Sequence, residues 1–244
     1  MKHDIAIFKI GGKILDNSKN LINTIAQLTQ LYEDQIIKKI LLIPGGGILA
    51  NFIRELYHEF QIDDDFAHWM AIYSMNYNGV VLNKKFPHLN SIENLDQLKK
   101  EGSYFSIFLP YKYLKNNDEL PHSWSVTSDS IALYMAYKLG TNKCFLLKDV
   151  DGIIDKNQNL LKELSITKFE ELKAEEKLAE FPSEELYFKA KSKPLDSYIL
   201  TLIEKHKIPC IILNGASQEL RIFKYFRNAD NNLKIYSKIN PVYR

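Results

Sequence analysis

Short apolar runs alternate along the chain with longer stretches in which apolar positions recur at helical spacing. The runs are almost continuously apolar, as expected for strands that are buried on both faces. They predict strands at 5–10, 40–43, 104–109, 144–147 and 208–213, with a possible edge strand at 233–239. The periodic stretches predict helices at 21–32, 49–60, 67–82, 131–139, 167–181 and 195–206. This alternation predicts an α/β fold, a three-layer αβα sandwich around a mostly parallel sheet.

Composition narrows the class of protein. Of the 244 residues, 45% are hydrophobic and 25% charged, which is typical of a globular domain. The net charge of +2 argues against a nucleic-acid partner. No apolar run reaches the roughly 18 residues of a membrane helix, and the N-terminus does not resemble a signal peptide. The two cysteines, Cys144 and Cys210, lie in apolar runs, which favours reduced thiols and a cytoplasmic location.

Glycines follow the first two predicted strands. Lys9-Ile10-Gly11-Gly12-Lys13 ends the first strand, and Pro44-Gly45-Gly46-Gly47 ends the second. In an open α/β sheet, ligands bind beyond the carboxyl ends of the strands. Glycines there let backbone N–H groups approach an anion closely. Two such turns on neighbouring strands therefore suggest two anionic groups held side by side.

Several nucleotide-binding motifs can be tested directly. The P-loop pattern and the catalytic motifs of protein kinases are absent. The segment 45–50 fits the dinucleotide pattern G-x-G-x-x-A, with acidic residues at 63–65 about twenty positions on. A dinucleotide oxidoreductase would, however, leave the Lys9-x-Gly-Gly turn unexplained, and this fingerprint usually follows the first strand.

Two later segments carry charge at the ends of elements. Thr127 or Ser128 can cap the helix that ends before Gly140, which puts Asp129 in its first turn. The loop Lys148-Asp149-Val150-Asp151-Gly152 follows the next strand. Lysines and amides that meet phosphates, with a carboxylate that holds the lysines, are what phosphoryl transfer requires.

With these four elements in this order, the chain resembles the amino acid kinase superfamily over nearly its whole length. The superfamily includes aspartate, glutamate, acetylglutamate and uridylate kinases. Within it, the segments 65–72 (DFAHWMAI) and 120–130 (LPHSWSVTSDS) resemble the kinase branch of methanofuran biosynthesis. That branch phosphorylates (aminomethyl)furanmethanol phosphate to its diphosphate.

The resemblance implies a role for each matched residue. Lys9 would lie against the transferred phosphoryl group, and Asp129 would orient the catalytic lysines. The acceptor would be cradled by Gly45, Gly46 and Gly47. The nucleotide side would comprise Gly11, Gly12, Lys148, Asp149 and Asp151. One lysine from the alternating set Lys189, Lys191 and Lys193 would also contact the nucleotide. Any of the three could serve, and we take Lys191 as the candidate. ATP and Mg²⁺ follow as cofactors, with no metal ligand assigned to the protein.

Aromatic and basic residues are candidates for the acceptor pocket. His68, Trp69, His122 and Trp124 either pack in the core or form a wall suited to a flat furan ring and a primary ammonium group. Arg54 is either a surface arginine or a bidentate partner for an acceptor phosphate. The Glu- and Lys-rich stretch 170–185 is either a solvated helix face or a flap over a ligand.

The sequence therefore predicts a single domain, 1–244, of an ATP-dependent kinase for a phosphate-monoester acceptor. About 1–122 would hold the acceptor and about 123–244 the nucleotide. Uridylate kinases and carboxylate kinases of the same fold are alternatives, as is a nucleotide-dependent molybdate or tungstate storage protein. We expect a homo-oligomer acting on a small molecule, without nucleic acid or membrane partners.

Overall fold

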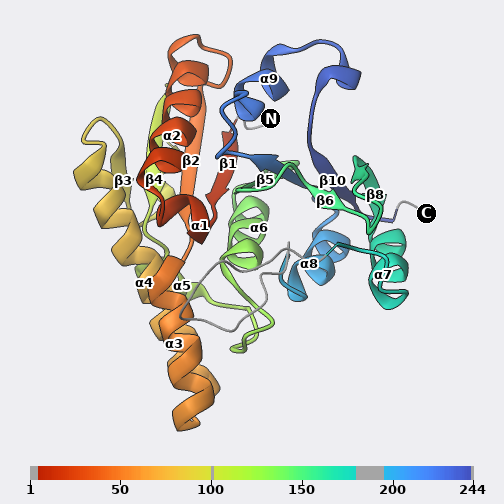
Figure 1. Ribbon diagram of the computed structural model, residues 1–244. Helices are drawn as coiled ribbons and strands as arrows, with labels where there is room; N and C mark the ends of the chain where they lie inside the picture. Colours follow the sequence, from red (N-terminus) through yellow and green to blue (C-terminus); the bar gives the residue numbers. More distant parts are fainter. Residues whose placement is uncertain (1–4, 100–101, 180–194, 243–244) are drawn as a thin grey trace.

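A central sheet organises the molecule (Figure 1). The computed structural model describes residues 5–99, 102–179 and 195–242. Its main sheet has the strand order β3-β4-β2-β1-β5-β9-β10-β8. The strands are β1 (Ile5–Ile10), β2 (Lys39–Pro44), β3 (Asn90–Ile92), β4 (Tyr104–Phe108), β5 (Cys144–Lys148), β8 (Glu163–Ser165), β9 (Cys210–Asn214) and β10 (Ser237–Asn240). A separate hairpin pairs β6 (Ile153–Ile154) with β7 (Leu160–Leu161).

The neighbouring strands from β3 to β9 run parallel, whereas β10 is antiparallel to β9 and parallel to β8. Helices cover both faces, so the αβα sandwich and the mostly parallel sheet are confirmed. The helices are α1 (Gly12–Leu15), α2 (Ser18–Glu33), α3 (Gly47–Phe60), α4 (Asp64–Lys85), α5 (Pro110–Asn117), α6 (Ser128–Lys138), α7 (Ile166–Ala174), α8 (Tyr198–His206) and α9 (Arg221–Arg227), with short 3₁₀ turns at Leu95–Lys99 and Asn231–Leu233.

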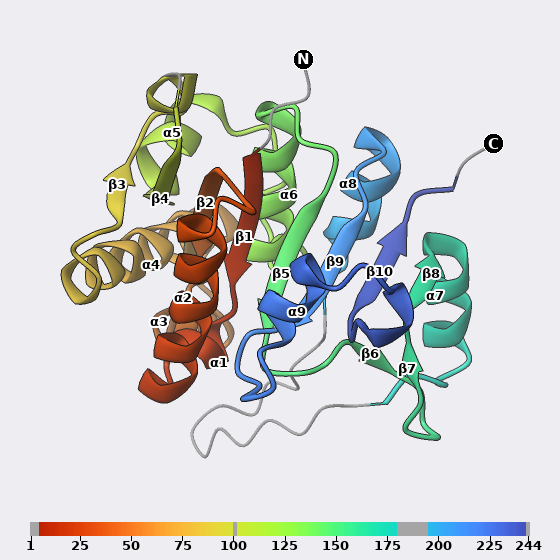
Figure 2. The same ribbon diagram turned by 90° about the horizontal axis from the view of Figure 1, so that it is seen from above.

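Side chains of the central strands point alternately to two hydrophobic cores. In β1, Ile5 and Ile7 join the core that contains α6 and α8, whereas Phe8 and Ile10 join the core that contains α2 and α9. Seen from above, α2 and α9 lie on one face of the sheet and α6 and α8 on the other (Figure 2). This burial on both faces explains why the central strands are continuously apolar.

Side-chain caps fix where several helices begin. Asn17 accepts hydrogen bonds from the backbone N–H groups of residues 19 and 20, so it caps α2, which begins three residues before the predicted range of 21–32. Thr127 caps α6 as predicted, and its hydroxyl accepts from the N–H of Asp129. These caps place the first residues of each helix beside the carboxyl ends of the strands.

Several boundaries differ from the sequence prediction. The charged helix expected at 167–181 ends at Ala174, and 180–181 lie outside the described residues. The helix expected from 195 begins at Tyr198. The last strand, β10, is not at the edge, because the three-residue strand β8 lies beyond it. Strands this short, and the short helices α5 and α9, give too few periods of a pattern to be recognised.

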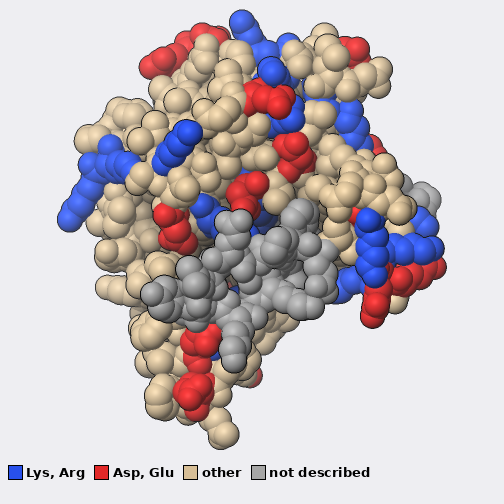
Figure 3. Space-filling model, in the orientation of Figure 1, with Lys and Arg blue, Asp and Glu red and all other residues tan. Residues whose placement is uncertain are grey.

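Three further features are the surface charge, the apolar character of the helices and the two thiols. On the face shown in Figure 3, acidic and basic side chains are interspersed rather than gathered into one basic stripe. Among the described residues, no helix combines the length and apolar character needed to cross a bilayer. Cys144 and Cys210 are fully buried free thiols at paired positions of β5 and β9.

Candidate active site

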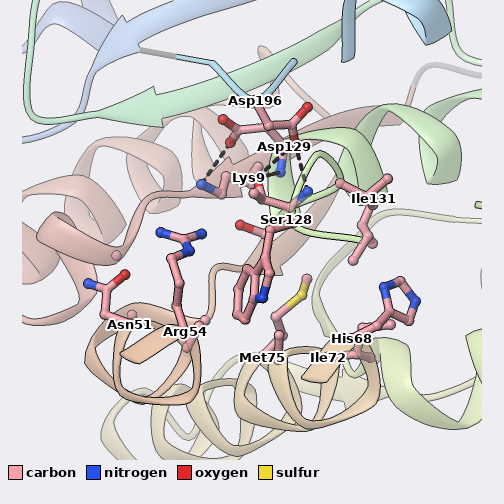
Figure 4. A pocket seen from close by; sticks show the side chains of 18 of the residues that line it. Lys9, Asn51, Arg54, His68, Ile72, Met75, Ser128, Asp129, Ile131 and Asp196 are labelled. Atoms are coloured by element: carbon pink, nitrogen blue, oxygen red, sulfur yellow. Dashed lines mark hydrogen bonds and ion pairs between the residues drawn. The ribbon is translucent and has the colours of Figure 1, made fainter. Parts of the chain in front are cut away.

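A pocket of about 420 Å³ lies where β1, β2 and β5 end. Figure 4 shows its side chains converging from the strand ends, from α3 and α4, and from the start of α6. This is the crevice at the carboxyl edge where open α/β sheets bind ligands. Its lining residues are Lys9, Gly12, Lys13, Gly46, Gly47, Ala50, Asn51, Arg54, Asp64, His68, Ala71, Ile72, Met75, Ser123, Trp124, Val126, Thr127, Ser128, Asp129, Ile131, Lys148, Leu195, Asp196 and Ser197.

Two lysines share one carboxylate on the pocket wall. Lys9 Nζ lies 2.8 Å from Asp129 Oδ1, and Lys148 Nζ lies 2.7 Å from Asp129 Oδ2. The pairing follows from topology: β1 and β5 are adjacent parallel strands, and both lysines lie at or near their carboxyl ends beside the first turn of α6. The pocket therefore has two ammonium groups fixed side by side, where they can bind the negatively charged groups of a ligand.

Electrostatics keep this carboxylate ionised. Burial opposes ionisation of Asp129, but the ammonium groups of Lys148 and Lys9 outweigh it and lower its pKa to about 2. For Lys9, burial lowers the pKa of the ammonium group, and the charge of Asp129 only partly offsets this effect. With both oxygens engaged by lysines, Asp129 is a poor general base and a good anchor for the two ammonium groups.

A second buried carboxylate, Asp196, ties together the starts of two helices. Its Oδ2 accepts from the backbone N–H and the hydroxyl of Thr127, at 2.9 and 2.8 Å, and from the N–H of Ser130 at 3.0 Å. Its Oδ1 accepts from the Ser130 hydroxyl at 2.6 Å and from the N–H of Ile199 at 2.8 Å. Burial raises the pKa of Asp196, and the charge of Asp129 adds to the effect. Asp196 thereby fixes the turn that carries Asp129.

The glycine turns divide into two kinds of position. The N–H of Gly11 donates to the carbonyl of Leu147, and the N–H of Gly45 donates to the carbonyl of Ile10, both at 2.9 Å. These two amides extend the sheet, so they are engaged before any anion arrives. The glycines that line the pocket are Gly12, Gly46 and Gly47, the last with a φ of +57° that favours glycine.

The predicted acceptor residues separate into a wall and a supporting layer. Trp124 lines the pocket, with the guanidinium carbon of Arg54 4.5 Å from its ring centroid. Its Nε1 is buried and has no hydrogen-bond partner among the residues that the structure describes. His68 also lines the pocket. Trp69 and His122 are not among the lining residues and pack together behind His68, with ring centroids 5.3 Å apart.

The predicted nucleotide residues also separate. Lys148 pairs with Asp129, as described above. Asp149 lies beside Lys13, with Oδ2 3.6 Å from its Nζ, and Asp151 contacts Arg221 at 3.3 Å; neither aspartate lines the pocket. The alternating lysines, Lys189, Lys191 and Lys193, lie outside the described residues.

Sequence reasoning missed several pocket residues. The main one is Asp196, whose position just before a periodic apolar stretch is a recognisable helix-start signal. Asn51 lies on α3 and the exposed Asp64 is the first residue of α4; neither belongs to a motif. Their placement depends on how two helices pack, which the sequence pattern does not specify.

Mg²⁺, which the resemblance to kinases implies, would need free carboxylates, and those of the described pocket are engaged by protein groups. Asp129 is held by two lysines, Asp196 accepts five hydrogen bonds, and Asp64 accepts one from Tyr57. The described part of the pocket thus lacks a pair of uncommitted carboxylates, so the protein residues do not fit a dedicated Mg²⁺ site. Mg²⁺ commonly stays bound to water and to the phosphates of its nucleotide, and ATP would enter as that complex.

Comparisons with known proteins agree with this geometry. Residues 4–214 match the model of the "Amino acid kinase family". The "[5-(aminomethyl)furan-3-yl]methyl phosphate kinase" of Methanocaldococcus jannaschii is 35% identical over 152 residues, which span 62% of this chain and 68% of the relative. The UMP kinase of Ureaplasma parvum has the same fold, with a TM-score of 0.63 and 18% identity over 98% of this chain and 97% of that one. The uridylate kinase of Archaeoglobus fulgidus gives a TM-score of 0.64 and 15% identity over 98% and 100%.

Proposed function

Because this chain belongs to the amino acid kinase family, we propose that it uses ATP to phosphorylate (aminomethyl)furanmethanol phosphate to the diphosphate in methanofuran biosynthesis. The kinase relative from Methanocaldococcus jannaschii supports a phosphate-bearing acceptor. In the reaction, an oxygen of the acceptor phosphate attacks the γ-phosphorus of ATP, a new P–O–P bond forms, and ADP leaves with the electrons of the broken bond.

The ion-paired Lys9, Asp129 and Lys148 carry the proposal. Two anionic reactants repel each other, and two fixed ammonium groups offset that repulsion and the charge of the transferred phosphoryl group. A phosphate monoester is already largely deprotonated at neutral pH, so the attack needs no general base. This matches a site whose central carboxylate, with a pKa of about 2 and two lysine partners, is unsuited to accept a proton.

The other end of the pocket supports a small, flat acceptor with a cationic group. Arg54 and the glycine turn at the start of α3 suit the acceptor phosphate. Trp124 offers an aromatic face and a buried indole N–H that finds no acceptor in the described part of the chain. Asp64 lies on the same pocket wall and suits a primary ammonium group. On this proposal, about 1–122 supply most of the acceptor site, with Trp124 added from the other half, and about 123–244 hold most of ATP. The nucleotide side comprises Gly11, Gly12, Lys148, Asp149, Asp151 and Lys191.

An exposed apolar face supports a homo-oligomer. Side chains on α3 and α4 that are each more than 40% exposed include Phe52, Phe60, Phe66, Tyr73 and Tyr77. In Figure 1, α3 projects away from the sheet. Exposed aromatic side chains on two neighbouring helices are common at subunit contacts. Consumption of ATP also supports the cytoplasmic location expected from the sequence.

The test is ADP release from Mg-ATP across a panel of acceptors: the furan phosphate, UMP, isopentenyl phosphate, aspartate, glutamate and acetylglutamate. We expect selective turnover of the furan phosphate. Arg54→Lys should raise KM for that acceptor more than it lowers kcat, because a lysine loses the bidentate contact. Lys112→Ala is the control, since its side chain is 71% exposed and does not line the pocket.

Two other outcomes of this experiment would contradict the proposal. Turnover of UMP or of an amino acid, with the furan phosphate inert, would favour a uridylate or carboxylate kinase. Nucleotide binding with no turnover of any acceptor, together with bound molybdate or tungstate in metal analysis, would favour a storage protein.

A further inference from the structure

We propose that His68, Asp118 and His122 form a binding site for one divalent transition-metal ion of the Zn²⁺ class. The three residues bring one ligand atom each to within 4.8 Å of one another. His68 Nε2 lies 2.9 Å from Asp118 Oδ2, and His122 Nε2 lies 3.3 Å from the same oxygen. The cluster is separate from the lysine-held carboxylate of the phosphoryl-transfer site, and the inference does not depend on which acceptor the kinase uses.

Hydrogen-bond accounting around His122 points to a cation. Its Nδ1 lies 2.5 Å from Asp65 Oδ1, while its Nε2 faces Asp118 Oδ2. Both ring nitrogens therefore face carboxylate oxygens, which only accept hydrogen bonds. A neutral imidazole has one N–H and can donate to only one of them. Two arrangements satisfy both contacts: an imidazolium that donates from both nitrogens, or a metal ion bound by Nε2 and by Asp118 that leaves Nδ1–H to donate to Asp65. The metal-uptake experiment below distinguishes them.

The surroundings of the cluster match those of known metal sites. A metal-binding histidine usually donates its second ring N–H to a carboxylate, which fixes its orientation. Asp65 takes that position toward His122. On the other side, Asp118 Oδ1 accepts the backbone N–H of Leu120 at 2.9 Å, which keeps Oδ2 turned toward the two histidines. The side chains of His68 and Asp118 are only 3% and 6% exposed, so both are held in place.

The spacing and the donor set decide which ions fit. With metal–ligand distances of about 2.0–2.1 Å, ligand atoms of a tetrahedral Zn²⁺ site lie roughly 3.3 Å apart. The two histidine–carboxylate distances, 2.9 and 3.3 Å, match this spacing. The rings of His68 and His122 are stacked, with centroids 4.1 Å apart and planes 15° apart, so one ring must turn to direct its Nε2 lone pair at a shared ion. Two imidazoles and one carboxylate suit Zn²⁺, Co²⁺ or Fe²⁺, whereas Mg²⁺ prefers oxygen ligands. The set thus distinguishes this site from the Mg²⁺ that accompanies ATP.

A bound ion would tie α4 to the loop between α5 and α6. His68 belongs to α4, whereas Asp118 and His122 precede α6, which carries Asp129. His68 also lines the pocket, and Figure 4 shows it away from Lys9 and Asp129. We therefore expect the metal to stabilise the acceptor-side wall, and to raise the melting temperature of the full chain.

The experiment uses the full chain after dialysis against a chelator, without nucleotide. Zn²⁺ uptake is measured by equilibrium dialysis with elemental analysis, and Co²⁺ serves as an absorbing probe. We expect one ion per chain, Co²⁺ bands more intense than those of the aqueous ion, and their loss on adding Zn²⁺. The variant His122→Ala should lose this uptake, and Asp65→Asn should weaken it by about 10- to 100-fold. His88→Ala, an exposed histidine elsewhere, is the matched control.

Folding of each variant is checked by its thermal melt, in which Zn²⁺ should raise the melting temperature of the wild type and of His88→Ala but not of His122→Ala. The proposal is overturned if the wild type takes up less than one ion per chain at micromolar Zn²⁺. It is equally overturned if a folded His122→Ala variant binds as tightly as the wild type, because the ion would then lie elsewhere.

Discussion

Replacing Asp129 by asparagine tests whether one carboxylate holds both lysines. The substitution preserves the shape of the side chain and removes its charge, so Lys9 and Lys148 lose their shared partner. The pKa of Asp129 falls from an ordinary value of 3.8 to about 2. At about 1.4 kcal/mol for each pKa unit, this shift corresponds to roughly 2 kcal/mol of stability from ionised Asp129. Removing one member of a buried ion pair costs about 3–5 kcal/mol, so we expect Asp129→Asn to lose about 3 kcal/mol.

The pH dependence gives an independent check. Because the pKa of Asp129 is lowered on folding, its contribution is fully present above the unfolded value near 4 and is lost as the pH falls toward 2. The difference in unfolding free energy between wild type and Asp129→Asn should therefore shrink by about 1 kcal/mol between pH 5 and pH 3.

Urea unfolding at pH 3, 5 and 7 measures these free energies, and steady-state kinetics measures the catalytic loss, expected at about 10²–10³-fold in kcat. Asp149→Asn is the control: its contact with Lys13 is 3.6 Å long and about a third exposed, so it should cost less than about 1 kcal/mol. Equal stability of wild type and Asp129→Asn, or a difference that does not change with pH, would refute the reasoning.

Three further substitutions test other parts of the site. Lys9→Met should lower kcat by at least about 10²-fold and lower the melting temperature less than Asp129→Asn does, because Asp129 keeps Lys148 as a partner and burial already disfavours the charge of Lys9; a loss of stability as large as that of Asp129→Asn would count against this account. Gly46→Ala should raise KM for the acceptor and destabilise the fold, since its added Cβ would lie 2.3 Å from Ala50 Cβ and 2.8 Å from Ser74 Oγ; unchanged kinetics would contradict the placement of this turn. Asp196→Asn should lower thermal stability by several degrees, because an amide nitrogen cannot accept the hydrogen bonds that Asp196 receives; a wild-type melt would show that these caps contribute little.

Local patterns sufficed for the fold and for part of the site. The apolar runs predicted the central strands because they are buried on both faces, and the position of Asp129 followed from a capping residue two places earlier. The contact of Lys148 with Asp129 was not predicted, because it depends on β5 pairing with β1 across more than 130 residues of chain. Sequence spacing carries no record of such a pairing.

The sequence also did not determine which aromatic and histidine side chains face the pocket. The segments 65–72 and 120–130 were expected together at one pocket, and the structure does bring them together. Only Trp124 and His68 reach the pocket, however, while Trp69 and His122 form the layer behind. Which of two neighbouring side chains faces a ligand depends on the rotation of α4 against the loop before α6. Periodicity does not determine that rotation when a helix, like α4, is apolar around much of its surface.

The burial of both cysteines makes this protein convenient for site-specific labelling. Cys144 and Cys210 are the only two thiols in the sequence, both are fully buried, and burial raises the pKa of Cys210 well above its ordinary value. Maleimides react with exposed thiolates, so the native chain should remain unmodified while folded. A cysteine introduced on α3 and another on α7 would therefore carry a fluorophore pair without removal of native thiols, and energy transfer between them would report whether the two halves approach each other when ATP and acceptor bind.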